Sequence, residues 1–153
     1  MSRAFVRELD ADTLESLPER PVSRQPNLVT AAGLAKIEAQ LRALDAARRA
    51  AEDDPEALAR IERDTRYWRQ RRATARLIEP PEAPSVVRFG VTVKLRFPDG
   101  AERSLRIVGE DEADPAAGLV GWTSPVATAL IGHLCGETVE LFGQRATITG
   151  LRP

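Results

Sequence analysis

Gly109-Glu-Asp-Glu-Ala-Asp-Pro115 and, nine residues later, Ser124-Pro-Val-Ala-Thr-Ala-Leu-Ile-Gly132 form the most informative stretch of this chain. The first segment carries four acidic side chains, which cannot all be buried because unpaired carboxylates are costly to remove from water. The second segment predicts a short helix with Ser124 as its N-cap and Pro125 in its first turn. An acidic loop beside the start of a helix suits a basic partner, so this stretch favours a binding protein over an enzyme.

The composition of the chain limits the classes of protein to which it can belong. Its 153 residues are enough for one domain or two small ones, and the net charge of −1 gives no general attraction to nucleic acid or anionic membranes. The single cysteine, Cys135, excludes an internal disulfide framework and a cysteine-based zinc site. No apolar run predicts a secretion signal or a membrane span. We therefore expect a cytoplasmic protein.

The distribution of prolines and of apolar residues predicts four regions. Residues 1–27 contain three prolines and no sustained periodicity, which predicts an extended or partly ordered tail. Residues 28–80 are expected to form a helical hairpin. Residues 81–85 are a proline-rich linker, and residues 86–153 are expected to form a globular domain.

Two amphipathic helices of about 20 residues are predicted in the hairpin region. Thr30 is a suitable N-cap for the first helix, and the pair Asp54-Pro55 supplies a second N-cap followed by proline at the first helical position. Apolar or small side chains recur every three or four residues, at Leu34, Ile37, Leu41 and Leu44 in the first helix and at Leu58, Ile61, Thr65 and Trp68 in the second. An antiparallel hairpin of this kind has little core of its own and must be braced at its base.

The C-terminal region shows the alternation of a half-buried sheet. Apolar residues alternate with polar ones from Val91 to Phe97, and Pro98-Asp99-Gly100 is a turn signal that leads into a return strand with Leu105 and Ile107. Shorter strands are predicted around Leu119 to Thr123, at Val139 and Leu141, and at Ile148 and Leu151. The fold class is therefore α+β: a two-helix hairpin followed by a small antiparallel sheet domain with one short helix.

These motifs together resemble the bacterial Gre transcription elongation factors. The resemblance rests on Val108–Asp114 and Ser124–Gly132, on Phe89-Gly90 at the entry to the domain, and on Leu28-Val-Thr-Ala-Ala-Gly-Leu34. It covers roughly residues 28–153. It implies that the C-terminal domain has a fold like that of the FK506-binding proteins.

The resemblance also implies a partner and a mode of action. In this family the C-terminal domain binds a coiled coil at the rim of the secondary channel of RNA polymerase, and the hairpin enters the channel. Acidic residues at the hairpin tip hold magnesium shared with the polymerase, which cleaves backtracked RNA by its own chemistry. The resemblance predicts a monomer with no membrane partner and no cofactor of its own. The residues expected to contact the partner are Asp111, Glu112, Asp114, Trp122, Thr123, Ser124 and Pro125.

The hairpin tip departs from the family pattern. The acidic turn is Glu52-Asp53-Asp54, without the longer acidic string of the family, so Asp53 and Asp54 are the candidate ligands for the shared magnesium. The hairpin is shorter than expected by roughly 20 residues, which removes about 15 Å of reach from each arm. Two alternatives stay open: a regulator that promotes RNA cleavage or alters pausing, and a non-cleaving channel binder that inhibits transcription or competes with true cleavage factors.

The second helix is rich in arginine. Because guanidinium groups suit phosphate, this face could lie near nascent RNA, with Arg63, Arg66, Arg69 and Arg72 as the nucleic-acid-proximal residues. The alternative is a solvated face with pairs such as Glu62 and Arg66 at i, i+4. Tyr67 is expected to support the helix against the globular domain.

An intrinsic enzyme activity is not expected. The chain has one histidine, no glycine-rich phosphate loop and no paired cysteines, and a metal role for His133 and Cys135 is rejected because no second pair of ligands exists. A prolyl isomerase remains a formal alternative through the fold resemblance, with few aromatic side chains to line its pocket: Phe89, Phe97, Trp122 and Phe142.

Overall fold

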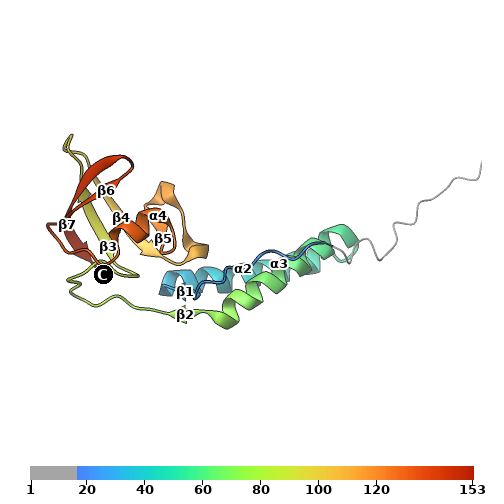
Figure 1. The fold of residues 1–153 in the computed structure, drawn as a ribbon. Helices are drawn as coiled ribbons and strands as arrows, with labels where there is room; N and C mark the ends of the chain where they lie inside the picture. The colour runs from blue at the N-terminus through green and yellow to red at the C-terminus, as the bar shows by residue number, and fades with distance from the viewer. Residues whose placement is uncertain (1–16) are drawn as a thin grey trace, which may run out of the picture.

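The computed structural model describes residues 17–153. Helices α2 (Ala31–Ala50) and α3 (Pro55–Thr74) form an antiparallel hairpin that stands out from the β-sheet domain as a paired rod (Figure 1). Each helix has 20 residues and is therefore about 30 Å long. The predicted α+β fold class, with a helical hairpin before the sheet domain, is confirmed.

Both helices begin at the predicted caps. The Thr30 hydroxyl accepts a hydrogen bond from the Gly33 amide at 3.0 Å, and the Asp54 carboxylate accepts one from the Ala57 amide at 3.1 Å. These bonds satisfy amide groups that the first turn leaves without helical partners. The predicted apolar stripe of α2 faces inward, where Ile37 is 1% exposed.

The sheet of the C-terminal domain has five strands and is mixed. Their spatial order is β5 (Leu119–Gly121), β4 (Glu102–Val108), β3 (Thr92–Arg96), β7 (Gln144–Arg152) and β6 (Thr138–Leu141). Most pairs are antiparallel as predicted, but β4 and β5 are parallel. The chain between them forms the short turns η1 (Glu110–Glu112) and η2 (Pro115–Ala117). These turns bring it back beside Arg106, so β5 runs parallel to the last three residues of β4.

The core of the domain lies between one face of this sheet and helix α4 (Pro125–Leu130). Val93 and Leu95 are completely buried, as their alternation predicted. Ser124 caps α4, because its hydroxyl accepts a hydrogen bond from the Ala127 amide at 3.3 Å. Phe89 and Phe97 are buried in the core, so these two aromatics do not form the open pocket of an isomerase.

Short strands join the hairpin to the domain. Strand β1 (Leu28–Val29) precedes α2, β2 (Arg76–Leu77) follows α3, and the two pair in parallel at the hairpin base. Residues 17–27 lie along the hairpin in extended form (Figure 1). The rest of the predicted tail, residues 1–16, lies outside the described residues. Among the helices that the structure describes, none has both the length and the apolar character to cross a membrane.

Candidate functional site

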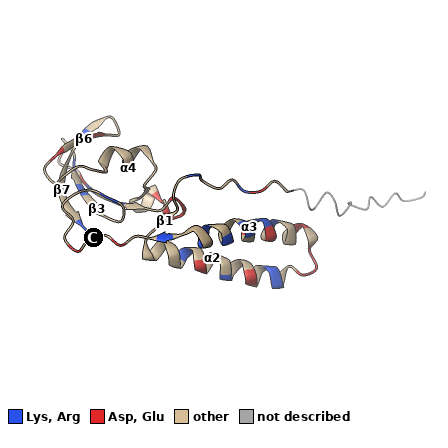
Figure 2. Cartoon of the chain, turned by 60° about the horizontal axis from the view of Figure 1, so that its bottom comes forward, with Lys and Arg blue, Asp and Glu red and all other residues tan. Residues whose placement is uncertain are grey.

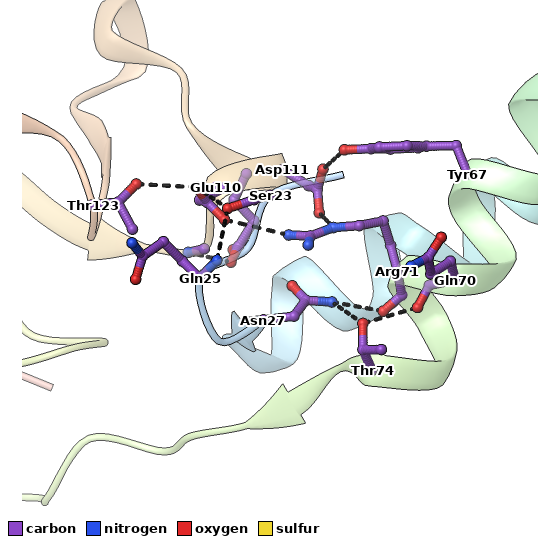
Figure 3. Close-up of polar contacts among 12 residues, drawn as sticks. Ser23, Gln25, Asn27, Tyr67, Gln70, Arg71, Thr74, Glu110, Asp111 and Thr123 are labelled. Carbon is purple, nitrogen blue, oxygen red and sulfur yellow. Dashed lines mark hydrogen bonds and ion pairs between the residues drawn. The ribbon is translucent and has the colours of Figure 1, made fainter. Parts of the chain in front are cut away.

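The acidic loop forms the junction between the hairpin and the sheet domain (Figure 3). The Asp111 carboxylate in η1 accepts hydrogen bonds from the Tyr67 hydroxyl at 2.7 Å and from Arg71 Nε at 2.5 Å. The Arg71 guanidinium also lies 3.7 Å from Glu110, and its side chain is only 2% exposed. A buried charge is tolerated when it is paired and hydrogen-bonded. Arg71 therefore joins α3 to the loop through an ion pair shielded from water.

Tyr67 supports the hairpin against the domain, as the sequence predicted. Burial, together with the hydrogen bond to Asp111, raises the pKa of its hydroxyl to about 12. The protonated phenol is the form that donates to the carboxylate. At neutral pH, Tyr67 therefore serves as a fixed hydrogen-bond donor at the junction.

Glu112 braces the beginning of α2. Its carboxylate accepts hydrogen bonds from the Thr30 hydroxyl at 2.5 Å, from the Thr30 amide at 3.3 Å and from the Gly109 amide at 3.2 Å. A Cβ atom on Gly33 would overlap this carboxylate, so glycine leaves the space that the Glu112 side chain occupies. The negative charge also interacts favourably with the N-terminal end of the helix dipole. The segment Thr30–Gly33 therefore has a structural role: it receives the Glu112 carboxylate at the start of α2.

Two of the three predicted partner residues in the acidic loop are turned towards the hairpin. Glu112 is 6% exposed, and the Asp111 side chain is 12% exposed, because both carboxylates bind groups of the hairpin. Asp114 is exposed, as expected. In this conformation, only Asp114 of the three presents its carboxylate to an external partner. Partner binding by these residues stays a prediction.

The segment after β5 lies beside the junction. The Thr123 hydroxyl donates to Glu110 at 3.1 Å, and Thr123 and Pro125 are exposed. Trp122 packs against the domain core, and its Nε1 atom is shielded from solvent without a hydrogen-bond partner among the described residues. Ser124 is occupied as the cap of α4. Thr123, Pro125 and Asp114 are therefore the predicted contacts that remain accessible.

The hairpin tip presents few free metal ligands. Glu52, Asp53 and Asp54 are exposed, but one oxygen of Asp54 caps α3. Within residues 17–153, no group of three histidine, cysteine, aspartate or glutamate side chains could hold a metal ion. Glu52 and Asp53 are the carboxylates of the tip that make no hydrogen bond or ion pair with described residues, and metal binding by Asp53 and Asp54 stays a prediction.

Basic and acidic residues both lie along α3 (Figure 2), and several of the predicted arginines are engaged in ion pairs. Arg63 pairs with Asp64 at 3.1 Å, Arg72 with Glu38 at 2.9 Å and Arg66 with Glu19 at 2.6 Å. A groove of about 840 Å³ between the helices is lined by five arginines and two carboxylates: Arg42, Arg48, Arg49, Arg66, Arg69, Asp45 and Glu62. The structure thus places Arg66 and Arg69, but not Arg63 or Arg72, in a basic groove.

The sequence interpretation missed the role of Arg71. This residue lies three positions after Trp68 and so continues the inward stripe of the helix. This spacing is the only feature of the sequence that indicates an inward-facing Arg71. The inward role of Glu112 had no local signal, because its partner Thr30 lies 82 residues away.

Comparison with known proteins identifies the sheet domain. The family model for the C-terminal domain of the GreA/GreB transcription elongation factors matches residues 81–149. GreB from Neisseria meningitidis serogroup B is 40% identical over 83 residues, which are 53% of this chain and 51% of that protein. GreA from Methylobacterium sp. strain 4-46 is 48% identical over 71 residues, which are 43% and 45% of the two chains.

The curated relatives are matched over only part of their length. The chain spans about half the length of the curated relatives it matches. A solved GreA/GreB factor from Nitrosomonas europaea is 22% identical, with 82% of this chain and 98% of that chain covered and a TM-score of 0.43. The predicted resemblance is confirmed by the family model and the curated relatives: residues 81–149 match the C-terminal domain of the Gre transcription elongation factors.

Proposed function

We propose that this chain is a regulator of transcription elongation that binds bacterial RNA polymerase at its secondary channel. The single observation that carries the proposal is the match of residues 81–149 to the Gre C-terminal domain. The domain would anchor on the coiled coil at the channel rim through the accessible residues Asp114, Thr123 and Pro125. The hairpin, which stands out from the domain, would then point into the channel (Figure 1).

The shape of the hairpin supports a role inside a narrow channel. Its two helices are antiparallel and about 30 Å long, and its tip carries exposed carboxylates rather than apolar side chains. The groove between the helices carries an excess of arginine, including Arg66 and Arg69, which supports a contact with nascent RNA. A protein of this kind would act in the cytoplasm as a monomer.

The tip determines which effect the chain has on the polymerase. Asp53 and Asp54 are the residues that would hold magnesium shared with the polymerase. Magnesium in a two-metal site stabilises both the attacking and the leaving oxygen. Because Asp54 also caps α3 and the hairpin is short, a second function has specific support: occupation of the channel without cleavage, which blocks true cleavage factors.

Binding of the full chain to purified RNA polymerase, measured by interferometry, tests the shared part of both functions. We expect binding at micromolar concentration or tighter, with weaker binding after Asp114→Ala. Glu140→Ala is the matched control, because Glu140 is an exposed carboxylate on β6, away from the junction. Absence of binding to the polymerase would exclude both functions.

A stalled, backtracked transcription complex with magnesium distinguishes the two functions. Cleavage that is lost after Asp53→Asn supports metal delivery. Asp54→Asn is the useful second variant, because asparagine keeps the N-cap of α3 while it removes the charge. No cleavage, together with inhibition of an added cleavage factor, supports the channel-blocking function.

A further inference from the structure

The described part of the N-terminal tail contacts both bodies of the molecule. Residues 17–27, here called the strap, run beside α3 in the same direction as that helix, from Glu19 opposite Arg66 to Asn27 opposite Thr74. The Gre family model begins only at residue 81 and does not include this segment. Its contacts therefore need an explanation of their own.

On the hairpin side, the strap contacts side chains of α3. Glu19 accepts two hydrogen bonds from the Arg66 guanidinium, at 2.6 and 2.9 Å. The Arg20 guanidinium lies 3.9 Å from the centre of the Tyr67 ring and 3.6 Å from Asp64. A guanidinium over an aromatic face is attracted by the ring electrons. Arg20 therefore covers the same tyrosine that hydrogen-bonds the sheet domain.

On the domain side, the strap reaches the acidic loop. The Ser23 hydroxyl donates to Glu110 at 3.0 Å, and Glu110 also lies beside Arg71 and accepts from Thr123 (Figure 3). Four residues further on, the Asn27 side chain donates to the Arg71 carbonyl at 2.7 Å. The strap thus crosses the junction and covers the buried Arg71 ion pair.

The contacts lie at the base of the hairpin, so a small change in angle there moves the tip by a large distance. A swing of 10° about its base moves the tip of a 30 Å rod by about 5 Å. Metal ligation requires oxygen atoms within about 2 Å of the ion. The angle between the hairpin and the domain therefore decides what the tip can reach.

We propose that the strap is an intramolecular lock that fixes the angle between the hairpin and the sheet domain. Arg20 of the strap contacts Tyr67 of the hairpin, and Ser23 of the strap contacts Glu110 of the sheet domain. These two contacts together connect the hairpin to the domain. The lock is a property of the isolated chain, so it does not depend on the proposed binding to RNA polymerase.

Pulsed electron paramagnetic resonance on the full chain tests the lock. Spin labels are placed on Glu52→Cys at the tip and Glu140→Cys on the domain, in a Cys135→Ser background that removes the one native thiol. The test variant carries Glu19→Ala, Arg20→Ala and Ser23→Ala. The control carries Arg24→Ala and Gln25→Ala, whose exposed side chains make no hydrogen bond or ion pair with described residues.

We expect one narrow distance distribution in the parent chain and the control, and a distribution broader by about 5 Å or more in the test variant, equivalent to a 10° swing. Equal widths in the test variant and the control would overturn the proposal. If the triple variant fails to fold by circular dichroism, the single variants Arg20→Ala and Arg24→Ala decide in the same way. They remove the same charge from the same segment, and only Arg20 contacts α3.

Discussion

At the scale of single residues, the most consequential group is the guanidinium of Arg71. It is buried, and it pairs with Asp111 and Glu110 across the junction. Its neighbour Arg72 pairs with Glu38 at a site where both side chains are about half exposed. Two adjacent arginines on one helix thus make a buried and an exposed ion pair. Loss of the buried pair should lower the free energy of unfolding more than loss of the exposed pair.

Substitution of each arginine by alanine should separate these two cases. Arg71→Ala leaves the Asp111 and Glu110 carboxylates without their cationic partner and should lower the free energy of unfolding by about 3–5 kcal/mol. Arg72→Ala should lower it by less than about 1 kcal/mol. Chemical denaturation measures both. Similar losses in the two variants would contradict the assignment of Arg71 to a buried ion pair.

The ionisation of Tyr67 reports on the same junction. It is the only tyrosine in the chain, so ultraviolet absorption near the phenolate band follows it alone. The parent chain should titrate with a pKa of about 12. Asp111→Asn should lower this pKa because it removes the carboxylate charge, yet the pKa should stay above the ordinary 10.0 because burial remains.

The sign of the linked effect on stability follows from that shift. Folding raises the pKa of Tyr67, so the folded chain binds this proton more tightly than the unfolded chain. The contribution to stability is complete below pH 10 and is lost as the pH rises towards 12. Thermal unfolding at these pH values should show a steeper loss in the parent than in Asp111→Asn. Equal pH dependence would show that Tyr67 is not coupled to Asp111.

At the scale of elements, the beginning of α2 depends on a residue from the other body. Thr30 caps the helix through its own hydroxyl, and that hydroxyl donates in turn to Glu112. Gly33 leaves the space that the Glu112 carboxylate occupies. The helix start and the acidic loop are therefore one packed unit rather than two neighbouring surfaces.

Gly33→Ala tests this packing. Alanine favours a helix over glycine by about 1 kcal/mol, but its Cβ would overlap the Glu112 carboxylate, at a cost of about 1–3 kcal/mol. We expect a net loss of unfolding free energy of about 1 kcal/mol, which denaturant unfolding measures. In a Glu112→Ala background the overlap disappears, so the same substitution should become neutral or stabilising. Additive effects in the double variant would show that the two residues do not interact.

At the scale of the whole molecule, the local signals predicted the rod and the domain but not how they are joined. Thr30 and Asp54 mark helix starts because an N-cap acts within three residues, and the alternation around Val93 marks a strand for the same local reason. Tyr67 and Asp111 lie 44 residues apart, so no local pattern shows that the acidic loop turns inward. The parallel pairing of β5 was missed because it depends on the path of that loop.

The residues predicted to contact a partner differ in how accessible they are in the structure. The segment at Thr123 and Pro125 is exposed next to the junction, as a docking surface requires. The carboxylates of Asp111 and Glu112 are used within the chain, where they bind Arg71 of α3 and Thr30 at the start of α2. A partner would therefore contact the edge of this junction rather than its centre.

The most direct test of the whole account is a photo-crosslink from the hairpin tip in the bound complex. A photoreactive amino acid replaces Asp53 in the full chain, and the crosslinked polymerase peptides are identified by mass spectrometry, with Glu140 as the control position on the domain. We predict crosslinks from position 53 to the lining of the secondary channel and none to that lining from position 140. Crosslinks from position 53 confined to the outer surface of the polymerase would contradict a domain that anchors at the rim while the hairpin points inward.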